Sequence, residues 1–176
     1  MTIQDRKELE EWHSIEDPWG YENSSEDEKR KQILLSEIPE EKYSSVLDIG
    51  CGQGFITREL PGSKILGIDI SFEAIERARK FQNKRLTFEQ ASIFELPNLD
   101  HESYDLIVIT GVIYPQYVGK SLNLLYHYVN QILKDDGVLV SVHINEWYSA
   151  RFPYLQTKLI SYPYREFTHR LEVYRK

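Results

Sequence analysis

The sequence predicts an α/β fold, a doubly wound and mostly parallel sheet of about seven strands with an antiparallel edge. Between residues 43 and 144, short apolar segments of strand length alternate with amphipathic segments of helical spacing. Strands that are apolar on both faces are typical of a parallel sheet covered by helices. Residues 156–176 differ, because they carry many aromatic and β-branched side chains without helical spacing. They predict two strands, paired antiparallel at the sheet edge.

Residues 1–42 are predicted to form an acidic, helical segment ahead of the sheet. They contain 13 acidic and 6 basic residues, so the net charge of −7 lies entirely within them. Ser24 or Ser25 can cap a helix over residues 26–37, whose first turn carries three acids and thus complements the helix dipole. Pro39 ends this helix.

The elements expected to build the sheet follow. Strands are predicted at residues 45–49, 64–70, 85–89, 105–110 and 138–144. Helices are predicted to begin at Phe55, at the capping Ser71 and near Leu122, where apolar residues recur at helical spacing. The last two strands are expected within residues 145–176, on either side of Tyr162-Pro163. All 176 residues are predicted to form a single domain, because a chain of this length suffices for one.

The composition argues against several classes of protein. The longest apolar runs, such as residues 106–109, are of strand length, and the first residues lack the basic and apolar regions of a secretion signal, so no membrane partner is expected. A single cysteine, Cys51, allows no internal disulfide, so a cytoplasmic location is expected. No block of Lys and Arg follows a phosphate backbone, which disfavours nucleic acid. No set of His, Asp and Glu has metal-ligand spacing, so no metal is predicted.

The strongest chemical signal is the glycine-rich segment VLDIGCGQGF, residues 46–55. Gly50, Gly52 and Gly54 alternate directly after the first predicted strand. Glycine tolerates positive φ and has no Cβ, so a ligand can lie directly on such a loop, whereas a tight turn alone needs only one or two glycines. We therefore expect these glycines, and Cys51 between them, to contact a ligand.

The neighbouring acids favour a cationic nucleoside as that ligand. The dinucleotide spacing G-x-G-x-x-G fails, because Phe55 stands three residues after Gly52. Asp48 suits a cation or a hydrogen-bond donor better than an anion, and S-adenosylmethionine carries an ammonium, a sulfonium and no phosphate. Asp69 ends the second predicted strand, where a carboxylate can accept both ribose hydroxyls. Ile70, the next residue, is also predicted to contact the ligand.

These segments resemble the class I S-adenosylmethionine-dependent methyltransferases over residues 43–144, which are therefore the predicted cofactor-binding core. The stretch DIGCGQG, residues 48–54, is similar to the first motif of that family, and Asp69 matches its ribose-binding acid. The resemblance implies a Rossmann-like methyltransferase fold. It also implies that S-adenosyl-L-methionine is the cofactor.

Three further segments carry the same resemblance. Phe88–Ile93 resembles the segment that contacts adenine, with Ser92 where the family usually has Asp, so that Ser92 and Ile93 are expected to border the adenine. Thr110 opens a segment that follows the fourth strand, where such enzymes line the methyl-donor pocket. Lys134–Gly137 resembles the turn before the fifth strand.

A narrower resemblance is to the nodulation-type N-methyltransferases that act on an amino sugar. It is carried by DPWGY, residues 17–21, and by VIYPQY, residues 112–117. It implies a small-molecule acceptor, with a saccharide as the leading candidate. Trp19 and Tyr21 are candidates to close over the donor or the acceptor, although an anchoring role for their segment is equally compatible.

Methyl transfer from a sulfonium releases a neutral thioether, so positioning and desolvation can supply most of the catalysis. A hydroxyl acceptor additionally needs a base. Tyr114 and Tyr117, just past the fourth strand, are expected to orient the acceptor or to pack beside the sulfonium methyl. His143, near the end of the fifth strand, is the best-placed base. The alternatives are a rim aromatic for Tyr114 and a structural histidine for His143.

The sequence thus predicts a methyltransferase that acts on an amine or a hydroxyl of a small molecule. The short segment 145–156 leaves little chain to cover the acceptor, so an open acceptor side is expected. An oligomer is compatible with the sequence. The alternatives are an inactive cofactor-binding partner subunit and, less favoured, a nicotinamide-dependent oxidoreductase.

Overall fold

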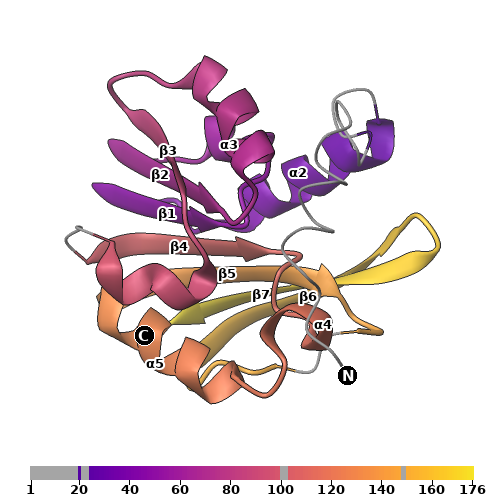
Figure 1. Cartoon of the computed structure of the whole chain (residues 1–176). Coiled ribbons are helices and arrows are strands. Elements are labelled where there is room, and N and C mark those ends of the chain that lie inside the picture. Colours follow the sequence, from indigo (N-terminus) through magenta and orange to yellow (C-terminus); the bar gives the residue numbers. More distant parts are fainter. Residues whose placement is uncertain (1–19, 21–23, 100–102, 148–149) are drawn as a thin grey trace.

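The computed structural model describes residue 20 and residues 24–99, 103–147 and 150–176. These residues contain one seven-stranded sheet of order β3-β2-β1-β4-β5-β7-β6 (Figure 1). The five strands from β3 to β5 are parallel, whereas β7 lies antiparallel between β5 and β6. The predicted fold class, mostly parallel with an antiparallel edge, is confirmed.

The bounds of most elements agree closely with the apolar pattern of the sequence, but β5 begins at Leu133 and not at the predicted residue 138. The strands are β1 (Ser45–Ile49), β2 (Lys64–Asp69), β3 (Leu86–Gln90), β4 (Tyr104–Thr110), β5 (Leu133–Ile144), β6 (Leu155–Tyr164) and β7 (Phe167–Arg175). The α-helices are α2 (Ser25–Glu37), α3 (Phe72–Ala78), α4 (Pro115–Val118) and α5 (Leu122–Ile132). Short 3-10 helices are η1 (Thr57–Glu59), η2 (Arg79–Phe81) and η3 (Ile93–Asn98).

Alternate residues of the strands face two separate cores, because successive side chains of a strand point to opposite faces. Val46 of β1 belongs to the core covered by α2 and α3, together with Leu34 and Ile75. Its neighbour Leu47 belongs to the core covered by η3, α4 and α5, which includes Leu125. The sheet is therefore the middle of three layers, as the continuous apolar strands predict.

The helix ends confirm the predicted caps. The Ser24 hydroxyl accepts a hydrogen bond from the backbone N–H of Asp27 at 3.2 Å, and α2 ends at Glu37 before the extended Ile38. The Ser71 hydroxyl accepts from the N–H of Ala74, also at 3.2 Å. Each cap supplies an acceptor to an otherwise unpaired first-turn N–H.

The helix predicted from Phe55 is wrong in extent, because the chain forms only the single 3-10 turn η1 there. Pro61-Gly62 follows too soon for an α-helix to gain from its nucleation. Helix α2 covers this short segment instead. Lys31 of α2 forms an ion pair with Glu59, and its ammonium lies 4.3 Å from the ring centroid of Phe55.

The turn between the last two strands also differs from the prediction. It lies at Arg165-Glu166, where Arg165 has a φ of 51°, and not at Tyr162-Pro163. Pro163 is accommodated inside β6 because this is the edge strand, whose outer side needs no N–H donor. Among the described residues, no helix has the length and apolarity needed to cross a bilayer.

Candidate functional site

A cavity of about 660 Å³ opens at the carboxyl ends of the parallel strands. Its walls come from the segments that follow β1, β2, β3 and β4, and from the end of β5. β1 lies between β2 and β4, so the chain order of the strands reverses at β1, and crevices at such points hold ligands in open α/β sheets. The predicted residues that line it are Asp48, Gly50, Cys51, Gly52, Asp69, Ile70, Ser92, Ile93, Thr110 and Tyr114.

Four predicted residues are not placed in this cavity. Gly54 does not line it; a Cβ there would lie 2.8 Å from Cζ of Phe88, so this glycine permits close packing inside the core. His143 does not line it either. Trp19 and Tyr21 lie outside the described residues, so their predicted roles stay predictions.

The glycine loop is fastened to β2 and leaves an open cradle. The backbone N–H groups of Gly50 and Cys51 both donate to the carbonyl of Ile68, at 2.8 and 3.0 Å. Gly52 has a φ of +54°, and a Cβ placed on it would meet no atom within 4 Å. The loop therefore presents bare backbone to the cavity, which matches the predicted approach of a ligand.

Asp69 links the end of β2 to this loop. One carboxylate oxygen accepts from the N–H of Gly52, and the other accepts from the N–H of Ser71, both at 2.9 Å. Each carboxylate oxygen can accept more than one hydrogen bond, so these contacts remain compatible with a ribose diol. They also fix the orientation of the carboxylate before any ligand arrives.

Asp48 is a buried carboxylate in the cavity wall. Its Oδ2 accepts from the Thr57 hydroxyl at 2.7 Å, whereas its Oδ1 has no hydrogen-bond partner within the described part of the chain. The pKa of Asp48 is raised to about 7, mainly by burial; Asp69 adds to the rise, while Thr57 and Arg30 oppose it. A buried carboxylate oxygen that can accept a further hydrogen bond fits a cationic donor group. The ammonium of S-adenosylmethionine is such a group.

Ser92, which is predicted to border the adenine, also caps a helix. The Ser92 hydroxyl caps η3 by accepting from the N–H of Phe94 at 3.2 Å, and Glu95 accepts from the N–H of Ser92 at 2.7 Å. A hydroxyl retains its own hydrogen and a second acceptor site, so a contact with adenine remains compatible with the cap. Ile93 is half-buried beside it and supplies an apolar surface.

Aromatic side chains form the opposite end of the cavity. Tyr114 is buried, and its hydroxyl accepts from the N–H of Ile144 at 2.7 Å. Its ring packs edge-on to Trp147, with 5.8 Å between centroids, and lies 6.0 Å from Tyr117. Trp147 in turn contacts Phe167 of β7 at 4.8 Å. These rings give this end of the cavity apolar faces and hold Tyr114 in one orientation.

His143 points to the sheet face covered by α4 and lies fully buried outside the cavity. Its Nε2 accepts from the N–H of Ile113 at 3.1 Å, and its Nδ1 lies 3.1 Å from the Ser141 hydroxyl. Burial lowers the pKa of His143 to about 3, so the ring is neutral. A general base must reach the acceptor, and this geometry gives no support to that predicted role. It supports instead a role in holding the turn that carries Tyr114.

We expect His143→Leu to lower the free energy of unfolding by about 1–3 kcal/mol, because the buried N–H of Ile113 loses its acceptor. Denaturant unfolding measures this loss. His143→Gln is the control, since its amide oxygen can accept the same hydrogen bond. Unchanged stability in the Leu variant, combined with a fall in the rate of methyl transfer of more than about 100-fold, would restore the general-base role.

The sequence analysis missed the contribution of the β6–β7 hairpin. Residues 164–167 at its tip, together with His169, line the same cavity, and Arg30 of α2 joins them. The hairpin and α2 thus supply a wall of the cavity that the sequence analysis did not predict, and the open acceptor side stays a prediction. The many aromatic residues of segment 156–176 could have indicated a role in the site. Their position depends on the turn between β6 and β7, which was predicted three residues too early.

The described residues contain no group of three or more His, Cys, Asp or Glu side chains that could hold a metal ion.

Comparison with known proteins identifies related sequences. A sequence model of a protein family described as "Methyltransferase domain" matches residues 40–169. The chain is 32% identical over 101 residues to malonyl-[acyl-carrier protein] O-methyltransferase of Legionella pneumophila, an alignment that covers 54% of this chain and 34% of that protein. It is 29% identical over 111 residues to nodulation protein S of Rhizobium tropici, with 60% and 45% covered. The chain therefore spans less than half the length of these curated relatives.

A solved structure is similar over almost the whole chain. N-methyltransferase NodS from Bradyrhizobium japonicum WM9, in complex with S-adenosyl-L-homocysteine, superposes with a TM-score of 0.81 at 20% identity, and 97% of each chain is covered. At this level of identity the likeness concerns the fold. It confirms the predicted Rossmann-like methyltransferase fold.

Proposed function

Since the chain belongs to the methyltransferase domain family, we propose that it transfers the methyl group of S-adenosylmethionine to an amine or a hydroxyl of a small molecule. Family membership agrees with the resemblance to class I S-adenosylmethionine-dependent methyltransferases. The observation that carries the proposal is one cavity that combines the bare backbone at Gly52 with Asp48 and Asp69.

The donor, when bound, supplies a methyl group activated by a sulfonium. Asp48 is proposed to hold its ammonium and Asp69 its ribose hydroxyls, on either side of the glycine loop. Ser92 and Ile93 are proposed to border the adenine. Because these groups are fixed by hydrogen bonds within the chain, the donor would be oriented without a large rearrangement of the site.

An amino sugar is the first candidate acceptor. The aromatic rings of Tyr114, Tyr117 and Trp147 offer flat apolar surfaces at the end of the cavity where the acceptor would enter. Likeness to nodulation protein S and to N-methyltransferase NodS supports N-methylation, whereas likeness to the malonyl-[acyl-carrier protein] O-methyltransferase supports O-methylation. A single domain over residues 1–176 and a cytoplasmic location remain part of the proposal.

Two rival functions can be separated from this proposal by binding and turnover. A nicotinamide-dependent oxidoreductase should bind NADH and not S-adenosylhomocysteine, so a calorimetric titration with each ligand distinguishes the two. An inactive cofactor-binding subunit should bind S-adenosylhomocysteine normally but methylate none of a panel of amino sugars and hydroxy acids with labelled donor. Turnover of any of these acceptors excludes that rival.

We expect Asp69→Ala to weaken binding of S-adenosylhomocysteine by about 1–3 kcal/mol, or roughly 5- to 150-fold, because a charge-assisted contact is lost. Isothermal titration calorimetry on the purified chain measures this change. Glu73→Ala, an exposed acid in the first turn of α3, is the matched control and should bind as the wild type does. Equal affinity in all three proteins would contradict the assignment of Asp69.

A further inference from the structure

We propose that His169 is a specificity-determining residue of the acceptor site, and that its Nε2–H donates a hydrogen bond to an uncharged oxygen of the acceptor, such as a hydroxyl group. This inference rests on the proposed methyl transfer, because it names a group that the acceptor carries in the same cavity. His169 belongs to β7, outside the segments that hold the proposed donor site.

His169 lies at the aromatic end of the cavity. It pairs with Ile144, the last residue of β5, so it stands at the same edge of the sheet as the ends of the parallel strands. Phe167, two residues earlier in β7, contacts Trp147. The groups proposed to hold the donor follow β1, β2 and β3, and β7 lies three strand spacings from β1, or roughly 14 Å. The acceptor is therefore the ligand closest to His169.

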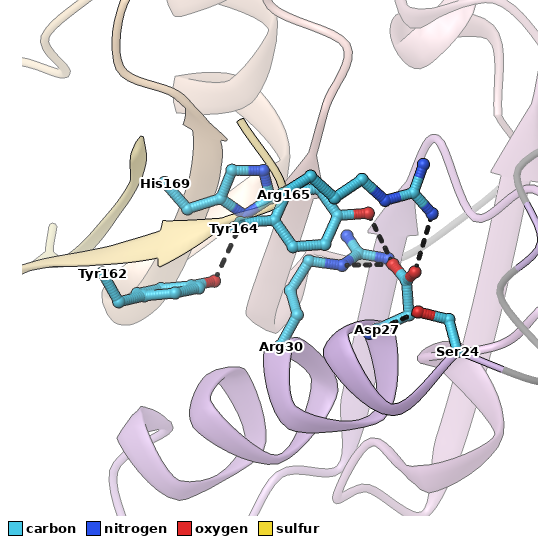
Figure 2. A network of polar contacts seen from close by, with 7 residues as sticks. All are labelled: Ser24, Asp27, Arg30, Tyr162, Tyr164, Arg165 and His169. Carbon is cyan, nitrogen blue, oxygen red and sulfur yellow. Dashed lines mark hydrogen bonds and ion pairs between the residues drawn. The ribbon is translucent and has the colours of Figure 1, made fainter. Parts of the chain in front are cut away.

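One nitrogen of the His169 ring is held within the protein, and Figure 2 shows the other on the side turned away from Tyr162. The residue is only 5% exposed, and its Nδ1 lies 3.4 Å from the Tyr162 hydroxyl. Nε2 has no hydrogen-bond partner among the described residues. It is also not one of the solvent-inaccessible atoms without a partner in that part of the chain, so it borders open space. The cavity that His169 lines is that space, and a ligand there can pair with Nε2.

The Tyr162 hydroxyl determines which nitrogen of His169 carries the hydrogen. This phenol is buried, and Nδ1 is the one acceptor that the described residues offer to its O–H. A buried hydroxyl donates where an acceptor is in reach, so the O–H of Tyr162 donates to Nδ1 and the hydrogen of the neutral ring lies on Nε2. Tyr164 stacks on the same ring, with 4.1 Å between centroids, and fixes its plane. The cavity therefore faces an oriented N–H donor.

The ring is uncharged at neutral pH. The pKa of His169 is lowered to about 3, mainly by burial and also by Arg30 and Arg165. Asp27 and Glu146 oppose this shift. A neutral ring that carries its hydrogen on Nε2 cannot act as a base there, so its role is to position the acceptor. An uncharged donor of this kind suits an uncharged oxygen, which a sugar supplies as its hydroxyl groups.

The test compares two amines, of which only one carries hydroxyl groups. Glucosamine and cyclohexylamine are titrated calorimetrically into the full chain saturated with S-adenosylhomocysteine, at about pH 6, where both amines are protonated. We expect His169→Phe to weaken binding of glucosamine about fivefold or more, because the hydrogen bond is lost while the ring contacts with Tyr162 and Tyr164 are retained. Binding of cyclohexylamine should change less than about twofold, since it offers no oxygen.

Three further variants keep this test decisive. His169→Gln retains a side-chain N–H donor and should bind glucosamine within about twofold of the wild type. His127→Phe is the matched control, because His127 is exposed on α5 outside the cavity; it should bind both amines as the wild type does. His169→Phe combined with Tyr162→Phe removes the hydroxyl that would be left without its acceptor, and should show the same loss for glucosamine in a more stable protein.

The proposal is overturned if glucosamine does not bind to the wild type, if His169→Phe weakens both amines equally or neither, or if His169→Gln binds glucosamine as weakly as His169→Phe. The affinity for S-adenosylhomocysteine is measured in the same samples. A loss of about tenfold or more in both Phe variants would place His169 beside the donor and also overturn it. Absence of binding to the wild type would contradict the proposed function. Normal affinity without a selective loss for glucosamine would contradict this inference alone.

Discussion

Asp48→Asn should weaken binding of S-adenosylhomocysteine by roughly 100-fold and, at pH 8, make the ligand-free protein more stable. The loss of affinity follows from the loss of the only charge that faces the proposed ammonium from β1. The gain in stability follows from burial, because the folded protein holds an ionised carboxylate, one oxygen of which has no hydrogen-bond partner among the described residues. The Asp48 side chain would then destabilise the folded protein and strengthen binding of the ligand.

The pH dependence has a definite sign. The carboxyl of Asp48 titrates at about 7 in the folded protein but near the usual 3.8 when unfolded. The folded state therefore binds more protons between these values, and stability falls by about 1.4 kcal/mol per pH unit as the pH rises through this window. The stabilising contribution is complete below pH 3.8 and is lost by about pH 7, a total of about 4 kcal/mol.

Denaturant unfolding between pH 5 and pH 8 would measure this effect, with Asp48→Asn showing a flatter profile than the wild type. Calorimetry over the same range should show affinity for S-adenosylhomocysteine rising with pH and levelling above about 7, since the ligand binds the ionised form. Parallel stability profiles for the two proteins would contradict the pKa of Asp48. Undiminished affinity in the variant would contradict its contact with the ammonium.

Local patterns in the sequence were sufficient to predict the sheet and most of the donor side of the site. β1 has the bounds predicted from its apolar run, and Gly50, Asp48 and Asp69 meet because parallel strands end at one edge. These inferences needed only residues close in the sequence. Because the predicted strands are parallel, their carboxyl ends meet at one edge of the sheet, so the motifs that follow them were predicted to lie close together.

The cavity wall formed by α2 and the β6–β7 hairpin depends on contacts that no local pattern reveals. Asp27 and Arg165 are 138 positions apart, and they meet only because a hairpin folds back over α2. His143 was predicted at the site from its place near the end of β5. Its neighbour Ile144 lines the cavity, whereas His143 is fully buried and does not line it, so the difference of one position along the strand decides the outcome.

Gly50→Ala and Gly52→Ala should differ in their main effect although they alter the same loop. A Cβ at Gly50 would lie 2.3 Å from Cγ1 of Val112, and the residue has a φ of +79°. Overpacking and the left-handed backbone each cost about 1–3 kcal/mol, so we expect Gly50→Ala to lower the free energy of unfolding by about 3 kcal/mol or more. Thermal or denaturant unfolding measures the loss.

Gly52→Ala should instead affect mainly the ligand. No atom lies within 4 Å of the added Cβ, so only the left-handed φ of +54° costs stability, about 1–2 kcal/mol. The methyl group would project into the cavity and weaken binding of S-adenosylhomocysteine by at least about tenfold. Val112→Ala combined with Gly50→Ala should recover part of the lost stability, because it removes the atom in the closest contact. If the two single variants lose stability equally, or if Gly52→Ala binds the ligand normally, then the open backbone at Gly52 is not where the donor lies.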